Sequence, residues 1–108
     1  MRLPTDTLIA EEKLTGYLLK QRTEDDKSRF LAQAGYKPEN ANQLLTDIRS
    51  QLMPLEATQI EQTDYGPKYV IRGGLTGPNG IALLVVTIWM TDLTTGITKF
   101  ITLYPDKK

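Results

Sequence analysis

Four cations that could meet a phosphate are spread along the chain, namely Lys27, Arg29, Arg72 and Lys99. A lysine or arginine beside a phosphoryl group stabilises the negative charge that develops during cleavage. A helix and a sheet can bring such side chains together at the sheet rim, so the four could converge on one anion. The alternative is four separate charges in solvent, where each contributes little. Spacing alone leaves both alternatives open.

Aromatic side chains accompany the cations in the second half of the chain, at Tyr65, Tyr69, Trp89 and Tyr104. Rings that stack on bases, interleaved with cations, are typical of surfaces that hold single-stranded RNA. Aromatic residues in a small domain also build its core. Of the four, we expect Tyr65 and Tyr104 to lie nearer the surface.

Threonine hydroxyls on the expected strands are a third group with chemistry to offer, at Thr87, Thr98 and Thr102. A hydroxyl can position a phosphate or a ribose oxygen. Threonine is equally favoured on strands for its branched side chain. The hydroxyls alone are therefore weak evidence for a site.

The chain has neither histidine nor cysteine. Serine–histidine–aspartate triads, thiolate nucleophiles and nearly all zinc sites are therefore excluded. The acids at residues 24–26 suit a helix start better than an ion site. The glycine-rich residues 73–80 join strand to strand, which indicates a hairpin with a bulge rather than a phosphate loop. We expect no metal and no cofactor.

Thirteen basic and thirteen acidic side chains cancel. The neutral net charge therefore gives no long-range electrostatic field that would attract nucleic acid or an anionic membrane. A local basic patch is still compatible with this neutral total. The longest apolar run, residues 81–90, is half of what a membrane-spanning helix needs. The absence of cysteine fits a reducing compartment, and the N-terminus lacks a signal-peptide pattern. We expect a cytoplasmic protein without membrane contact, folded as one domain over residues 1–108.

Three helices are expected to position these side chains, over residues 10–20, 25–34 and 38–52. The third is the clearest, because Pro38 suits a first helical turn, Pro54 ends the segment and apolar residues recur at helical spacing. Those apolar residues are Ala41, Leu44, Leu45, Ile48 and Leu52. Gly35 is expected to terminate the second helix.

From residue 55 onward the apolar pattern alternates, which predicts strands over residues 55–62, 68–73, 81–90 and 97–104. The third strand is apolar on both faces and should be central. We expect its even-numbered face, from Ala82 to Met90, to meet the helices, and Thr87 and Trp89 to lie on the open face. The fold class is α+β, with three N-terminal helices packed on one face of a four-stranded antiparallel meander sheet.

A family resemblance covers almost the whole chain. The residues that carry it include Asp26-Lys27 with Phe30, Gly35-Tyr36, Tyr65-Gly66 with Tyr69, and residues 75–80, 86–89 and 99–102. In these the chain resembles a family of small bacterial proteins, frequent in cyanobacteria and known as a domain of unknown function. Related domains occur at the C-termini of secreted polymorphic toxins. The order of helices and then strands is similar to that of the barnase, EndoU, colicin and RelE group of ribonucleases.

The resemblance implies a ribonuclease-toxin-like domain that acts on or binds RNA at the open sheet face, as an endoribonuclease that needs no metal. Cations would stabilise charge on the phosphorane, and hydroxyls would position or activate the 2′-hydroxyl. The residues given catalytic roles are Arg72, Lys99, Thr102 and Tyr69, and those expected to bind substrate are Lys27, Thr87, Trp89 and Tyr104. The hypothesis requires the cations and hydroxyls to share one hollow, free of ion pairs with nearby carboxylates.

The competing hypothesis is a non-catalytic interaction module. Neutral charge and the lack of a complete catalytic set favour it. In this case the sheet would dock a small partner protein, such as an antitoxin-like protein or the product of a neighbouring gene. A homodimer through the edge of the first or fourth strand is compatible with either hypothesis.

Overall fold

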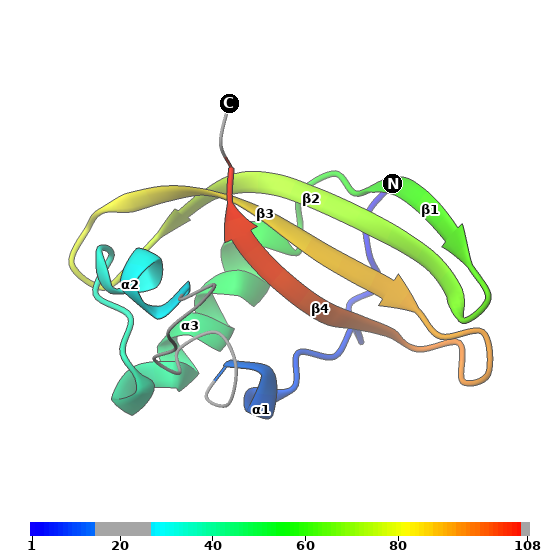
Figure 1. The fold of residues 1–108 in the computed structure, drawn as a ribbon, viewed down its shortest axis with the longest axis horizontal. Helices are drawn as coiled ribbons and strands as arrows, with labels where there is room; N and C mark the ends of the chain where they lie inside the picture. Colours follow the sequence, from blue (N-terminus) through cyan, green and yellow to red (C-terminus); the bar gives the residue numbers. More distant parts are fainter. Residues whose placement is uncertain (15–26, 107–108) are drawn as a thin grey trace.

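The structure is a computed structural model, and it describes residues 1–14 and 27–106. Helices and strands follow one another along the chain, and Figure 1 shows how they are arranged. The elements are α1 (Glu11–Lys13), α2 (Lys27–Ala32), α3 (Ala41–Asp47), β1 (Thr58–Thr63), β2 (Gly66–Thr76), β3 (Ala82–Thr91) and β4 (Thr98–Pro105). A 3-10 turn, Pro38–Asn40, precedes α3, and a π turn, Ile48–Leu52, follows it. The chain is thus α+β.

The four strands form one antiparallel sheet in the order β1-β2-β3-β4. Each strand pairs with the next along the chain, so the predicted meander is confirmed. The β2–β3 hairpin turns where the glycine-rich segment predicted it, but its register runs without the predicted bulge. A bulge occurs instead between β3 and β4, where Trp89 pairs with Phe100 and Ile88 with Thr102, which leaves Ile101 without a direct partner.

The prediction of three N-terminal helices packed on the sheet was wrong. In the part of the chain that the structure describes, the one substantial helical segment is the continuous run from Pro38 to Leu52. α1 has 3 residues and α2 has 6. The rest of the first predicted helix, and the acids at residues 24–26, lie outside the described residues. The predicted stop at Gly35 agrees with its φ of 93°.

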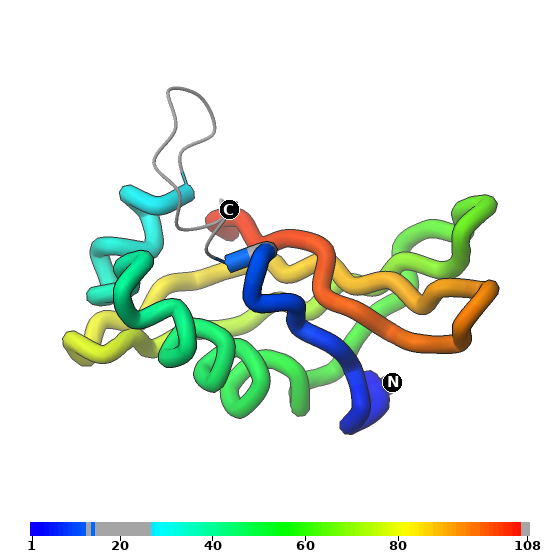
Figure 2. The backbone as a smooth tube through the Cα atoms, turned by 90° about the horizontal axis from the view of Figure 1, so that it is seen from below, coloured from blue at the N-terminus to red at the C-terminus, as the bar shows by residue number. Residues whose placement is uncertain are grey.

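The N-terminal residues pair with the sheet before α1 begins. The Leu8 amide donates to the Thr98 carbonyl at 2.9 Å, and the Phe100 amide donates to the Leu8 carbonyl at 2.8 Å. Figure 2 shows this segment running beside β4. These bonds satisfy backbone groups at the edge of β4. They also hold the chain extended up to the start of α1 at Glu11.

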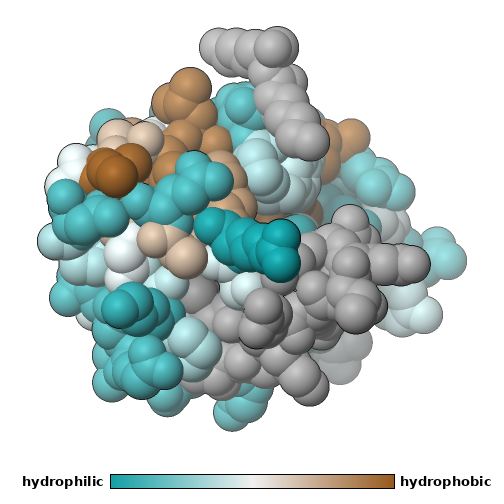
Figure 3. All heavy atoms as spheres, turned by 60° about the vertical axis from the view of Figure 1, so that its left-hand side comes forward, coloured by the Kyte–Doolittle hydropathy of each residue, from teal (hydrophilic) through white to brown (hydrophobic). Residues whose placement is uncertain are grey.

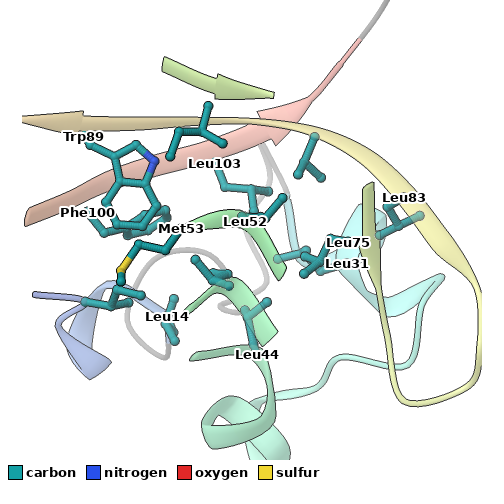
Figure 4. Packing of buried hydrophobic residues seen from close by; sticks show 14 of the residues in the cluster. Leu14, Leu31, Leu44, Leu52, Met53, Leu75, Leu83, Trp89, Phe100 and Leu103 are labelled. Carbon is teal, nitrogen blue, oxygen red and sulfur yellow. The ribbon is translucent and has the colours of Figure 1, made fainter. Parts of the chain in front are cut away.

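The hydrophobic core lies between the sheet and the helical segments, as Figure 4 shows. Trp89 and Phe100 meet edge to face from neighbouring strands, with ring centroids 5.3 Å apart. Helical side chains pack beneath the sheet and are fully buried, among them Leu14, Leu31, Leu44, Ile48 and Leu52. The apolar stripe predicted for residues 38–52 therefore faces this core.

The predicted orientation of β3 was inverted. Leu83, Val85, Thr87 and Trp89 are buried on the helix side, whereas Leu84 on the other side is 61% exposed. Neighbouring strands decide the orientation, because cross-strand partners share a face. The even-numbered residues of β3 pair with charged Lys68, Arg72 and Lys99, which resist burial.

The β2–β3 turn fixes α2 against the end of the sheet. The Asn79 side-chain amide donates to the Gln33 carbonyl at 3.0 Å. Gly77 lies so close to the chain after α2 that a Cβ atom built on it would be 2.0 Å from the Ala34 carbonyl oxygen. This contact therefore holds the chain after α2 against the turn. None of the described helices has the length and apolar character to cross a membrane.

Candidate functional site on the outer sheet face

One face of the sheet is turned away from the helices, and we call it the outer face (Figure 1). Three cross-strand rows make up its centre, because paired residues project to the same side. The rows are Lys68–Met90–Lys99, Val70–Ile88–Thr102 and Arg72–Val86–Tyr104. The bulge at Ile101 lets Lys99, Thr102 and Tyr104 share this face, although their numbers differ in parity.

A hollow of about 420 Å³ lies at the end of the outer face. Its lining residues are Arg72, Val86, Tyr104, Pro105 and Asp106. It therefore combines one cation, one carboxylate, one aromatic ring and two apolar side chains. The Asp106 amide donates to the Leu84 carbonyl at 2.9 Å, which extends the pairing of β4 with β3 and holds Asp106 in this place.

An ion pair crosses the hollow. Arg72 Nη1 lies 3.0 Å from Asp106 Oδ1. The arginine side chain is 59% exposed and the aspartate side chain 9% exposed. Arg72 thus fails the requirement that it be free of ion pairs with a nearby carboxylate. The pair instead holds the guanidinium in one orientation with most of its surface open to solvent.

Lys27 reaches the outer face from α2. Its Nζ atom donates to Thr102 Oγ1 at 2.9 Å. Thr102 lies two residues before Tyr104 on the same face of β4. Three predicted site residues, Lys27, Thr102 and Tyr104, are therefore neighbours, although α2 and β4 are far apart in the sequence.

Lys99 lies at the other end of the outer face. Its Nζ atom is 3.9 Å from Asp92 Oδ2, at the β3–β4 turn. Lys68, in the same row, has its Nζ atom 4.0 Å from Glu61 Oε1. Pairs this exposed and this long contribute at most about 1 kcal/mol, so both ammonium groups exchange partners readily.

Three predicted site residues lie on the helix side of the sheet. Trp89 and Thr87 are fully buried, and Tyr69 is 9% exposed. The Trp89 indole donates to Thr87 Oγ1 at 2.8 Å, and that hydroxyl donates to the Ile71 carbonyl at 2.9 Å. The prediction that Thr87 and Trp89 lie on an open face was wrong, because these bonds satisfy their polar groups inside the core.

A buried polar cluster that the sequence did not indicate joins the helical run to the sheet. Tyr36 donates its hydroxyl to Asp47 Oδ2 at 2.6 Å, and Gln43 donates to Asp47 Oδ1 at 2.8 Å. Burial, and then the bond to Asp47, raise the pKa of Tyr36 far above its usual value. Gln51 bonds both backbone groups of Thr76 nearby. The Tyr36 hydroxyl also lies 3.3 Å from the Thr76 carbonyl oxygen, so the cluster ties the helical run to β2.

Acidic side chains in the described ranges do not gather into a metal site. Nowhere in residues 1–14 or 27–106 do three or more carboxylates come together in a way that could hold an ion. Of the described residues that line the hollow, Asp106 is the acid.

These features define an α+β fold with a hollow of mixed polar and apolar lining on the outer face of a four-stranded sheet. The chain belongs to the family described as Domain of unknown function (DUF6883), whose model matches residues 4–107. The predicted family resemblance is confirmed at this level, and the ribonuclease group stays a prediction. No curated protein matches the chain.

A solved structure has a similar fold. It is the contact-dependent growth inhibition toxin and immunity protein complex from Klebsiella pneumoniae 342. One chain of that complex is 16% identical to this chain, with a TM-score of 0.69 over 93% of this chain and 100% of that chain. At this level of identity the likeness concerns the fold.

Proposed function

We propose that this domain is a toxin-like ribonuclease that binds RNA on the outer face of its sheet. One observation carries the proposal: Lys27 Nζ is bonded to Thr102 Oγ1 on the same face as Tyr104 and Arg72. A cation, a hydroxyl and an aromatic ring on one surface suit a single-stranded RNA ligand. The similar fold of a chain in a toxin and immunity protein complex supports the toxin-like class.

The reaction proposed is attack of a ribose 2′-oxygen on the adjacent phosphorus. The bond from phosphorus to the 5′-oxygen breaks, which leaves a 2′,3′-cyclic phosphate and a 5′-hydroxyl. The 2′-hydroxyl gives its proton to solvent. The Lys27 ammonium stabilises the negative charge on the phosphorane and donates a proton to the departing 5′-oxygen.

Thr102 orients the Lys27 ammonium through its hydrogen bond, and Tyr104 positions the ribose or base. Because Tyr69 is buried on the helix side, the proposal gives the tyrosine role to Tyr104. Lys99 lies one cross-strand row from Thr102, because the bulge at Ile101 leaves their β3 partners only two residues apart, roughly 7 Å at strand spacing. We therefore assign it to a neighbouring phosphate. A site of action on RNA implies a cytoplasmic location.

The test is cleavage of labelled RNA oligonucleotides in excess EDTA. The wild-type domain should give 2′,3′-cyclic phosphate products. Thr102→Val and Lys27→Ala should each lower the rate by about 100-fold, as expected for loss of one stabilising group. The matched controls are Thr94→Val, in the β3–β4 turn, and Lys37→Ala, before the 3-10 turn, and both should cleave at the wild-type rate. RNA left intact by the folded wild-type domain would remove the proposal.

A second candidate is a docking surface for a small partner protein. The outer face exposes Leu84 and half-exposes Ile88 and Met90. Hydrophobic residues also gather near the top of the side shown in Figure 3. Contiguous exposed apolar side chains often mark protein interfaces. The solved structure with a similar fold is itself a complex of two proteins.

Co-expression with the product of an adjacent gene separates the two candidates. The docking module is favoured if the domain forms a stable complex that Leu84→Asp disrupts and if the domain never cleaves RNA. A partner that binds and suppresses cleavage favours the toxin. A doubled molecular mass of the domain in the absence of a partner protein would indicate a homodimer. Neither candidate predicts that result.

A further inference from the structure

Among the residues that the structure describes, the lining of the hollow beside Arg72 carries one charge of each sign. It contains one guanidinium and one carboxylate, and their closest atoms are 3.0 Å apart. A phosphate drawn to Arg72 would lie beside the Asp106 carboxylate and be repelled by it. The hollow therefore suits a neutral ligand better than an anion.

The ion pair between Arg72 and Asp106 leaves hydrogen-bond donors on Arg72 and acceptors on Asp106 unused. A guanidinium has five N–H donors and a carboxylate accepts about four hydrogen bonds, and the pair uses one of each. Donors from Arg72 thus lie next to the Asp106 carboxylate at one edge of the hollow, where 9% of the aspartate side chain is exposed. A ligand that fits must present an acceptor beside a donor.

The remaining lining is flat and apolar. Tyr104 offers an aromatic ring and Pro105 offers aliphatic surface, whereas Val86 lies beneath them and is almost fully buried. A planar heterocycle gains binding energy by stacking on such a ring, as bases do in single-strand binding proteins. Planarity, neutrality and a mixed polar edge together describe a nucleobase.

We propose that this hollow is a base-recognition pocket for guanine. Guanine presents its O6 and N7 acceptors to arginine, the commonest specific contact of that base. Its N1–H and N2 amino group are two adjacent donors that one carboxylate can accept together. Adenine, cytosine and uracil each offer the carboxylate a single donor group. The Arg72–Asp106 pair is therefore better matched to guanine than to the other bases.

This inference rests on the proposed function and divides the roles of its residues. Arg72 and Asp106 hold the base, whereas Lys27 and Thr102 meet the phosphate. Tyr104 and Thr102 are two residues apart on one face of β4, roughly 7 Å. One nucleotide can span that length, so guanine in the hollow brings its own phosphate to Lys27.

The experiment measures binding of nucleosides, which lack a phosphate, to the wild-type domain by calorimetry or NMR titration. Guanosine should bind about tenfold or more tightly than inosine, which lacks the N2 amino group, and than adenosine or uridine. Equal affinities for guanosine, inosine and adenosine would overturn the inference. Inorganic phosphate that displaces guanosine from the wild-type hollow would overturn it as well.

The Asp106→Asn variant should change the ligand preference of the hollow, which a loss of folding would not do. This variant should lose the preference for guanosine over inosine and bind inorganic phosphate more tightly, because Arg72 is no longer neutralised. The matched control is Asp92→Asn, which removes the carboxylate beside Lys99 and should keep the wild-type preference. Asp106→Asn that still prefers guanosine would contradict the inference.

The outcomes for the inference and for the proposed function are separable. Guanosine binding without RNA cleavage removes the ribonuclease and leaves the guanine pocket. If RNA is cleaved without any preference for guanine and all nucleosides bind equally, the guanine-pocket inference is wrong and the ribonuclease proposal stands.

Discussion

Thr87 and Trp89 show how polar atoms can be buried at little cost. The indole N–H bonds the threonine hydroxyl, and the hydroxyl bonds the Ile71 carbonyl. Each donor therefore has an acceptor inside the core. Removing the shared hydroxyl would leave one donor and one acceptor without partners.

Thr87→Val should lower the free energy of unfolding by about 1–3 kcal/mol, because valine keeps the shape and loses both hydrogen bonds. Urea denaturation followed by tryptophan fluorescence measures the change. Thr58→Val, at an exposed threonine on β1, should leave stability within about 0.5 kcal/mol. An equally stable Thr87→Val protein would show that the buried bonds contribute nothing net.

Tyr36 predicts a loss of stability in alkaline solution. Its folded-state pKa is raised by burial and by Asp47, so the folded protein keeps the phenol proton when the unfolded chain, with a pKa near 10, releases it. This contribution is complete below about pH 10 and is lost as the pH rises further. Tyr36→Phe should remove that part of the pH dependence. Tyr65→Phe, at an exposed tyrosine, should retain it, and identical alkaline profiles for both variants would contradict the assignment.

Elements with strong periodicity were predictable, and elements set by distant pairing were not. Residues 38–52 and the four strands follow from apolar spacing and turn residues. The extended pairing of Leu8 with β4 has no local signal, because it depends on Thr98 and Phe100 far along the chain. The bulge at Ile101 was equally hidden, and it decides which β4 side chains reach the outer face.

The contact between the β2–β3 turn and the chain after α2 can be tested with two glycines. Gly77→Ala would put a methyl group against the Ala34 carbonyl, and overpacking of this kind costs about 1–3 kcal/mol. Gly74→Ala adds the same group in open space on β2 and should be neutral or slightly stabilising. Thermal unfolding compares the two. Equal melting temperatures for both variants would show that the turn can move away from α2.

Across the whole molecule, the described helical segments pack on one face of the sheet, and the candidate site lies on the outer face. The sequence predicted part of the candidate site there: Arg72, Lys99, Thr102 and Tyr104 lie on this face, and Lys27 reaches it. Asp106 was missed because its pairing with Arg72 spans 34 residues and depends on strand register. Trp89 and Thr87 were misplaced because composition alone did not fix which face is buried.

Salt dependence separates phosphate contacts from base contacts on this neutral molecule. Each phosphate contact with single-stranded RNA contributes about −0.7 to the slope of log affinity against log salt. Lys99→Gln should therefore make the slope shallower by about 0.7. Arg72→Gln should weaken binding and leave the slope nearly unchanged, because Arg72 is assigned to the base. Fluorescence anisotropy at several salt concentrations gives both slopes, and a shallower slope for Arg72→Gln would return Arg72 to a phosphate.

The central claim is that RNA binds the outer face, and NMR mapping tests it most directly. A guanine-containing RNA oligonucleotide, with 2′-deoxyribose at the cleavage position so that it stays intact, is titrated into ¹⁵N-labelled protein. The account predicts the largest amide shifts at Arg72, Val86, Thr102 and Tyr104. Shifts confined to the helical run at residues 38–52, or no shifts at any RNA concentration, would contradict it.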